Sequence, residues 1–133
     1  LLLHKACFDI LHQLVILWIA GRATPPEEVR ARFADFIVQR GTDVMFRCPA
    51  LPHFDLEDAE SNAVLTSIVV LQSAVLQYVG DAYLKFLYEA YLPSINCPPT
   101  LAHEFATQLQ GAAADRAKLK SVFKEFVRKL KGQ

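Results

Sequence analysis

Apolar residues near the C-terminus recur at the spacing of one face of an α-helix, and this is the clearest pattern in the chain. They occupy positions i, i+3, i+4, i+7, i+8 and i+11, which are Leu119, Val122, Phe123, Phe126, Val127 and Leu130. A stripe with this period is typical of a helix that packs one face against a core. No segment alternates cleanly between apolar and polar residues, and no Asn-Gly or Asp-Gly hairpin turn occurs. The pattern therefore predicts an all-α fold.

Glycine and proline residues divide the chain into six helical segments. The expected helices span residues 2–20, 26–48, 56–79, 81–93, 98–110 and 115–131. Consecutive helices pair as 2–48, 56–93 and 98–131, and each pair takes roughly 40 to 50 residues, the length of a HEAT-type repeat. We therefore expect residues 1–133 to form a single HEAT-like solenoid segment of about three antiparallel helix pairs. A compact six-helix bundle would give the same local pattern.

The first predicted helix is apolar on more than one side. One helical stripe consists of Leu3, Cys7, Ile10, Leu14 and Leu17. A second apolar set lies on other sides of the helix and consists of Phe8, Leu11, Val15 and Ile19. A helix that is apolar nearly all round is normally buried all round. We therefore expect the first stripe to face the chain's own core, and the second set to form an interface with an upstream repeat of a longer protein.

Composition excludes several classes of protein. The chain has 133 residues, of which 53% are hydrophobic and 21% charged, so it can bury a core. Lys plus Arg equals Asp plus Glu at 14 each, which excludes a polybasic protein. No uninterrupted apolar run of about 18 residues occurs, so no membrane insertion is expected. The three cysteines are widely spaced and form no CxxC pair, which favours a reducing compartment.

The sequence contains no residue arrangement typical of catalysis or metal binding. The histidines are His4, His12, His53 and His103, and they form neither an HExxH motif nor a His-x-x-x-His pair on one helical face. No serine lies in a G-x-S-x-G motif. The acidic run at residues 55–60 falls in the first turn of a predicted helix with Asp55 as its N-cap, where capping explains it. We predict a protein that is not an enzyme and has no cofactor or metal.

The balanced total charge conceals a basic C-terminal segment. Residues 115–133 carry seven basic and two acidic residues, a net charge of +5, whereas the remaining residues carry a net charge of −5. Four of the bases repeat every four residues and so lie in one row along the helix, namely Arg116, Lys120, Lys124 and Arg128. Such a row can follow a phosphate backbone. It can equally be the solvated face of a terminal helix.

Several segments resemble the exportin-T family of karyopherin-β nuclear export receptors. The most specific are FDLEDAE at residues 54–60 and YLPSINCPP at residues 91–99. The resemblance extends over almost the whole chain through KACFDILHQLVILW, FADFI and SVFKEFVRKLKG. It implies that the chain is the C-terminal part of a HEAT-repeat receptor that shuttles between nucleus and cytoplasm.

The resemblance also implies partners. Such a receptor binds tRNA together with Ran-GTP in the nucleus, passes nuclear pore proteins, and releases both ligands in the cytoplasm. Ran is expected to bind mainly to N-terminal repeats that are absent from this chain. A receptor for many tRNAs must recognise shape and backbone rather than base sequence, which favours the basic row as a tRNA contact. The alternative is a protein–protein scaffold of helical repeats that does not bind RNA.

Overall fold

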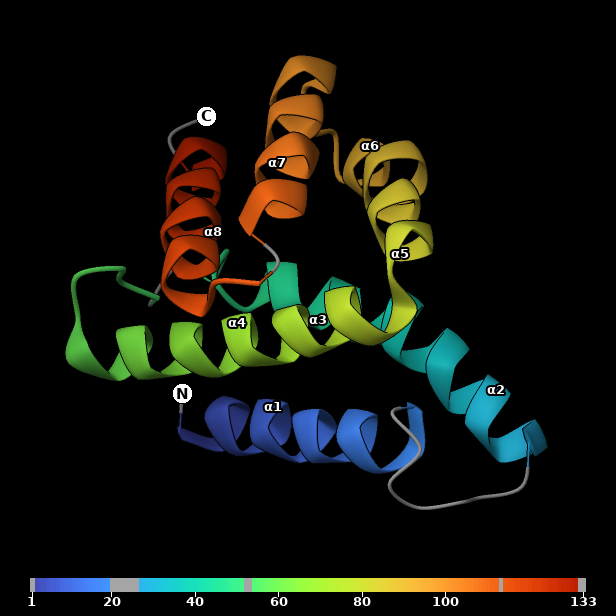
Figure 1. Cartoon of the computed structure of the whole chain (residues 1–133). Helices are drawn as coiled ribbons and strands as arrows, with labels where there is room; N and C mark the ends of the chain where they lie inside the picture. Colours follow the sequence, from blue (N-terminus) through green and yellow to red (C-terminus); the bar gives the residue numbers. More distant parts are fainter. Residues whose placement is uncertain (1, 20–26, 52–53, 113, 132–133) are drawn as a thin grey trace.

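A computed structural model describes residues 2–19, 27–51, 54–112 and 114–131, except for the side chains of Leu2, Trp18, Ile19 and Lys131. Within these ranges the chain is helical and has no strand, so the predicted all-α, HEAT-like helical fold is confirmed (Figure 1). Its elements, with η for a π-helical turn, are α1 (Leu2–Leu14), η1 (Val15–Ile19), α2 (Glu27–Phe36), η2 (Ile37–Gly41), α3 (Thr42–Arg47), α4 (Ala59–Val79), α5 (Asp81–Phe86), η3 (Leu87–Tyr91), α6 (Leu92–Ser94), α7 (Pro99–Ala112) and α8 (Arg116–Lys131).

The helix α4 lies at the centre of the molecule. On one side, α1 runs along α4 in the same direction, as equivalent helices of neighbouring repeats do (Figure 1). On the other side stand α8, α7 and the segment from α5 to α6, with α7 and α8 antiparallel. This packing differs from the predicted pairing of helix 2–20 with helix 26–48. The main partner of α1 is α4. The first segment of the chain contacts α2 chiefly through η1, the turn that follows α1.

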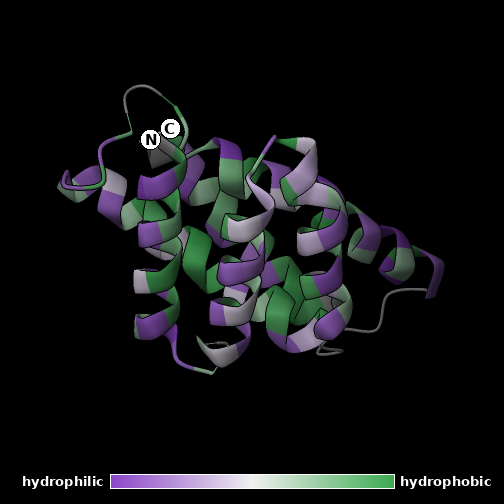
Figure 2. Ribbon diagram, turned by 90° about the horizontal axis from the view of Figure 1, so that it is seen from above, coloured by the Kyte–Doolittle hydropathy of each residue, from purple (hydrophilic) through white to green (hydrophobic). Residues whose placement is uncertain are grey.

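An aromatic cluster joins the first half of the chain to the second. The ring centroid of Phe46 in α3 lies 5.3 Å from that of Tyr91, 5.9 Å from Phe105, 5.4 Å from Phe123 and 5.8 Å from Phe126. The last three contacts are edge-to-face, an attractive geometry for aromatic rings. The cluster therefore ties α3 to η3, α7 and α8 at one point. Figure 2 shows the wider pattern, with hydrophobic residues between the helices and hydrophilic residues on the outside.

Two polar contacts lie beside this aromatic cluster. The hydroxyl groups of Thr42 and Tyr83 are 2.8 Å apart, and both residues are fully buried. Burial raises the pKa of the Tyr83 phenol, so it stays a neutral hydrogen-bonding group. The Tyr91 hydroxyl donates to Asp43 Oδ1 at 3.1 Å. Because buried polar groups need partners, both bonds fix the position of the segment from α5 to η3 against the start of α3.

The central helix α4 is long, apolar and mostly buried. Asp58 caps its N-terminus by accepting hydrogen bonds from the backbone N–H groups of Glu60 and Ser61. Gly80 ends it with a φ of 78°, a conformation that favours glycine. Among the described helices, α4 has the length and apolar composition to cross a bilayer, but 61% of its 18-residue apolar window is buried inside the fold. That burial is the pattern of a core helix.

His12 lies in the last turn of α1, close enough to Arg116 at the start of α8 for the two charges to interact. Its Nε2 atom is buried and has no hydrogen-bond partner. Burial lowers the pKa of His12, the nearby positive charge of Arg116 lowers it further, and Asp9 opposes both effects. The folded state therefore favours the neutral imidazole.

Replacing Phe46 tests the aromatic cluster. We expect Phe46→Ala to lower the free energy of unfolding by about 3–5 kcal/mol, because it opens a cavity at the point where four elements meet. Urea denaturation of both variants would measure this loss against the control Phe36→Ala, which changes a 48% exposed ring and should cost less than about 1 kcal/mol. Equal losses would contradict a central role for Phe46.

The lowered pKa of His12 predicts acid sensitivity. Because the unfolded state binds the proton more readily, stability falls as the pH drops below the unfolded value of 6.5. We expect His12→Gln to reduce this loss, measured as the change in melting temperature between about pH 7.5 and pH 5.5. The control is His103→Gln at an exposed position against Tyr88. An identical pH dependence in wild type and His12→Gln would refute the assignment.

Candidate nucleic-acid interface

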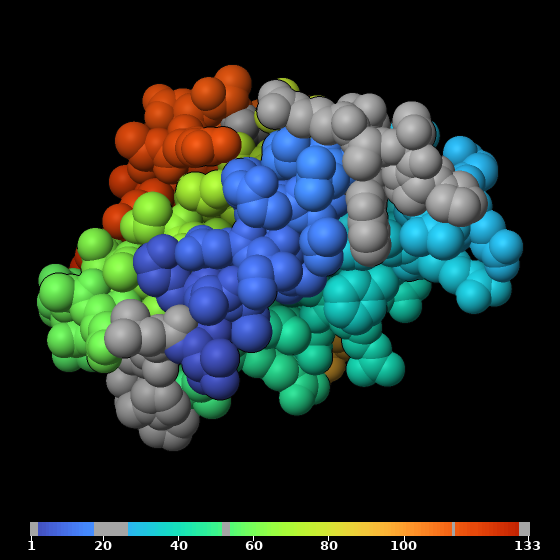
Figure 3. All heavy atoms as spheres, turned by 90° about the horizontal axis from the view of Figure 1, so that it is seen from below, coloured from blue at the N-terminus to red at the C-terminus, as the bar shows by residue number. Residues whose placement is uncertain are grey.

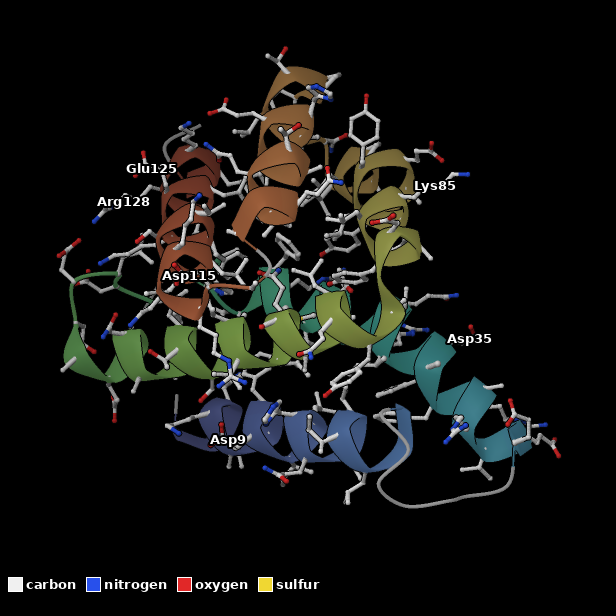
Figure 4. The ribbon with its side chains drawn as sticks, viewed as in Figure 1. Asp9, Asp35, Lys85, Asp115, Glu125 and Arg128 are labelled. Atoms are coloured by element: carbon white, nitrogen blue, oxygen red, sulfur yellow. The ribbon has the colours of Figure 1, made fainter. Side chains whose placement is uncertain are left out.

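The basic row lies on α8 because the opposite face of this helix is buried. Leu119, Phe123, Phe126 and Val127 are buried as the sequence pattern predicts, and Val122 and Leu130 pack against the same core. The four bases are spaced by four residues and follow one side of the helix. Figure 4 shows Arg128 and Glu125 on the outer side of α8, away from α7, and Asp115 at the foot of the helix near α4.

Glu57 pairs with both bases in the C-terminal half of the row. Arg128 Nη2 donates a hydrogen bond to Glu57 Oε1 at 2.6 Å, and Lys124 Nζ lies 3.9 Å from the same oxygen. Arg128 Nη1 is also 3.5 Å from Glu125 Oε2. The hydrogen bond that Arg128 donates to Glu57 is the main cause of the raised pKa of Arg128. A phosphate that bound here would have to compete with this carboxylate.

The N-terminal half of the row is not neutralised in this way. Arg116 and Lys120 form no ion pair with any residue in the part of the chain that the structure describes. Arg116 is exposed, and its charge reaches His12 on α1. The row therefore has two different halves: a free pair at the foot of α8 and a pair bound to Glu57 further along.

The predicted apolar interface on α1 is wrong in its choice of face. Phe8 is 1% exposed, Val15 is fully buried, and Leu11 packs partly buried against the core. The side chain of Ile19 lies outside the described residues. The physical reason is that α4 packs along this face of α1, so the large side chains point into the chain's own core.

Most of the other stripe of α1 stays open, although its member Leu14 packs partly buried against the core. Leu3 is 77% exposed and Ile10 60% exposed, and Cys7 and Leu17 are exposed beside them. Figure 3 shows α1 across this face of the molecule, with α4 on one side and α2 and α3 on the other. These four residues, which we call the outer face of α1, form an apolar surface with no described element over it.

The structure brings together no group of metal ligands among the residues that it describes. No group of three or more His, Cys, Asp and Glu side chains is close enough there to hold a metal ion. The edge of the His103 ring meets Tyr88, with ring centroids 5.6 Å apart, and His53 lies outside the described residues. Burial raises the thiol pKa of Cys48 and of Cys97, which makes both poor nucleophiles.

Sequence reasoning missed Glu57 as a partner of the row. The residue belongs to the acidic run that the sequence assigns to capping, and Asp58 does cap α4. Glu57 comes before that cap, in the turn where its backbone N–H donates to Asp55 Oδ1 at 2.9 Å. This turn leaves the Glu57 carboxylate free to reach α8, which lies 71 residues away in sequence.

Comparison with known proteins identifies the family. The family model of exportin-T matches residues 2–131. The chain is 37% identical to exportin-T of Mycosarcoma maydis over 130 residues, which cover 96% of this chain. It is 32% identical to exportin-T of Homo sapiens over 124 residues, or 93% of this chain, and 27% identical to that of Arabidopsis thaliana over 97% of it.

The match covers only a small part of each relative. The chain spans 12% of the length of the fungal and human proteins and 13% of the plant protein. No solved structure matches the chain significantly. Because the family model covers nearly every residue, and because the all-α fold is the one that the resemblance implies, the chain belongs to the exportin-T family.

Proposed function

We propose that this chain is one segment of a nuclear export receptor that binds tRNA together with Ran-GTP and shuttles between nucleus and cytoplasm. The observation that carries the proposal is the match to exportin-T over residues 2–131. The receptor acts by binding and not by catalysis. Ran-GTP binds mainly to repeats outside this chain, and nuclear pore proteins are further partners of the whole receptor.

The contact with tRNA in this segment is the basic row on α8. Phosphate contacts are long-ranged and independent of base sequence, as a receptor for many tRNAs requires. Arg116 and Lys120 are available without displacing a carboxylate, whereas Lys124 and Arg128 must exchange Glu57 for phosphate. The free half of the row therefore makes the larger contribution to affinity.

A second candidate function is a protein–protein scaffold, and the outer face of α1 favours it. Leu3 and Ile10 are large apolar side chains in solvent, and a contiguous exposed apolar surface marks an interface more often than chance. We propose that another helical segment of the longer protein covers this face, because a solenoid buries its repeats against each other and the relatives are about eight times longer than this chain.

Removing charges in pairs tests the tRNA contact. We expect Arg116→Ala/Lys120→Ala in the full-length receptor to weaken tRNA binding and to flatten the log–log salt dependence by up to about two units, one for each lost phosphate contact. Lys124→Ala/Arg128→Ala should have a smaller effect. The measurement is tRNA affinity in the presence of Ran-GTP at several salt concentrations.

A matched control for the charge pair is Arg40→Ala/Lys85→Ala. It also removes one Arg and one Lys, both exposed and outside α8. Figure 4 labels Lys85 on α5, away from the row. If this control lowers affinity and salt dependence as much as Arg116→Ala/Lys120→Ala, the row makes no specific contact, and the scaffold function is favoured.

Polar substitution tests the outer face of α1. We expect Leu3→Gln/Ile10→Gln to change the unfolding free energy of the 133-residue chain by no more than about 0.5 kcal/mol, because these side chains lie in solvent. In the full-length receptor the same substitutions should lower the melting temperature and raise amide hydrogen exchange in α1. No change in the full-length receptor would show that this face stays uncovered.

A further inference from the structure

An open hollow lies between the second half of α4 and the start of α8. Its volume is about 390 Å³, and it is lined by Ser73, Gln77, Ala114 and Arg116. Ser73 and Gln77 are four residues apart on α4, so both side chains face the same side of that helix. The hollow therefore brings two neutral hydrogen-bonding groups together with the first base of the row.

Ser73 is the buried member of the lining, because Gln77 and Arg116 are exposed. The residue is only 7% exposed, but its hydroxyl oxygen is not among the fully buried side-chain atoms that lack a hydrogen-bond partner. Some Ser and Thr hydroxyls of this chain bond to a backbone carbonyl one turn earlier, as Thr66 does with that of Asn62 at 3.1 Å. A hydroxyl that reaches solvent through a hollow can instead bond to water or to a ligand bound there. Ser73 lines the hollow, so its hydroxyl is available to a ligand there.

Among the described residues that line the hollow, Arg116 is the charged one and none carries a carboxylate. A guanidinium group presents paired N–H donors that match the oxygens of a phosphate. Two acidic residues, one directly before α8 and one on α1, already have partners of their own. Asp115 Oδ1 accepts the backbone N–H of Lys118 at 3.1 Å, and Asp9 Oδ2 lies 2.9 Å from Lys5 Nζ.

We infer that this hollow binds one phosphate group, with Arg116 supplying the charge and Ser73 and Gln77 donating hydrogen bonds to its oxygens. The inference rests on the proposed function in one respect, namely that the phosphate belongs to an RNA backbone. The inference gives the residues of the basic row different roles. Arg116 holds a phosphate in a defined place. Lys120 lies one turn, or about 6 Å, further along the helix axis and contacts the following phosphate.

A defined phosphate-binding site differs from a positively charged surface in two measurable ways. Binding at a charged surface depends on net charge and salt, and it does not saturate at one ligand per chain. A site with Ser73 and Gln77 saturates at one phosphate, and it weakens when the Ser73 hydroxyl is removed although the charge is unchanged. Ser73→Ala is therefore the informative variant, because alanine fits the space of serine and favours the helix.

The first experiment titrates the 133-residue chain with inorganic phosphate at constant ionic strength, followed by amide NMR. We expect saturable shifts at Ser73, Gln77 and Arg116, and a loss of at least five-fold in affinity in both Ser73→Ala and Arg116→Ala. Arg40→Ala is the control and should bind phosphate as the wild type does, because Arg40 is exposed, lies outside α8 and does not line the hollow. Shifts that never saturate, or that are equal in all three variants, would overturn the site.

The second experiment measures tRNA binding by the full-length receptor with Ser73→Ala. We expect a several-fold weaker affinity with an unchanged salt slope. Unchanged affinity, together with saturable phosphate binding, would overturn the assignment of the phosphate to RNA and leave a site for a free phosphate compound. If wild-type receptor binds no tRNA at all, the proposed function fails, whereas the phosphate titration still decides whether the site exists.

Discussion

The contact of Phe46 with four other aromatic rings is the constraint on which the rest of this structure depends. Phe46 comes from the first half of the chain, and its partners Tyr91, Phe105, Phe123 and Phe126 come from the second. Contacts between distant segments of a chain cost loop entropy, so they need a large gain in burial at the point of contact. The four rings around Phe46 supply that gain through buried area, and three of them also through edge-to-face geometry.

The same cluster determines the direction in which α8 presents its charges. Phe123 and Phe126 fix the rotation of the helix about its axis, so the basic row cannot turn toward the core. At its foot the row meets α4 near Ser73, and further along it meets the turn that carries Glu57. The apolar core therefore determines the electrostatic surface, although no charged residue takes part in the core.

Sequence pattern predicted α8 well and α1 poorly, for a physical reason. The helix α8 has one apolar stripe, so its period leaves one choice of buried face. The helix α1 has two, and local spacing cannot say which one packs inward. The choice depends on α4, which takes the side with the largest residue, Phe8, and leaves Leu3 and Ile10 outside. The spacing of apolar residues shows which faces of a helix could be buried, and the neighbouring helix determines which of them is buried.

The acidic run at residues 55–60 shows a similar limit. Its composition predicts a helix start, and the structure has one, but Asp58 and not Asp55 is the N-cap of α4. Asp55 instead caps the preceding turn through the backbone N–H of Glu57. Capping depends on the backbone angles of one residue, which composition does not specify. The hollow at Ser73 could not be predicted either, because α4 and α8 bring its lining together from distant segments.

The two halves of the row imply an order of binding. Ion pairs between exposed side chains are weak and screened by salt, so Glu57 competes with a phosphate without blocking it. If the row binds RNA as proposed, a phosphate at the N-terminal end of α8 would meet Arg116 without displacing any carboxylate, so that contact would form first. Later phosphates of the same backbone would then reach Lys120, and after it Lys124 and Arg128, at high local concentration, which is the condition under which Glu57 is displaced. Binding in this order would be reversible at each step, which suits the proposed role of a receptor that releases its cargo.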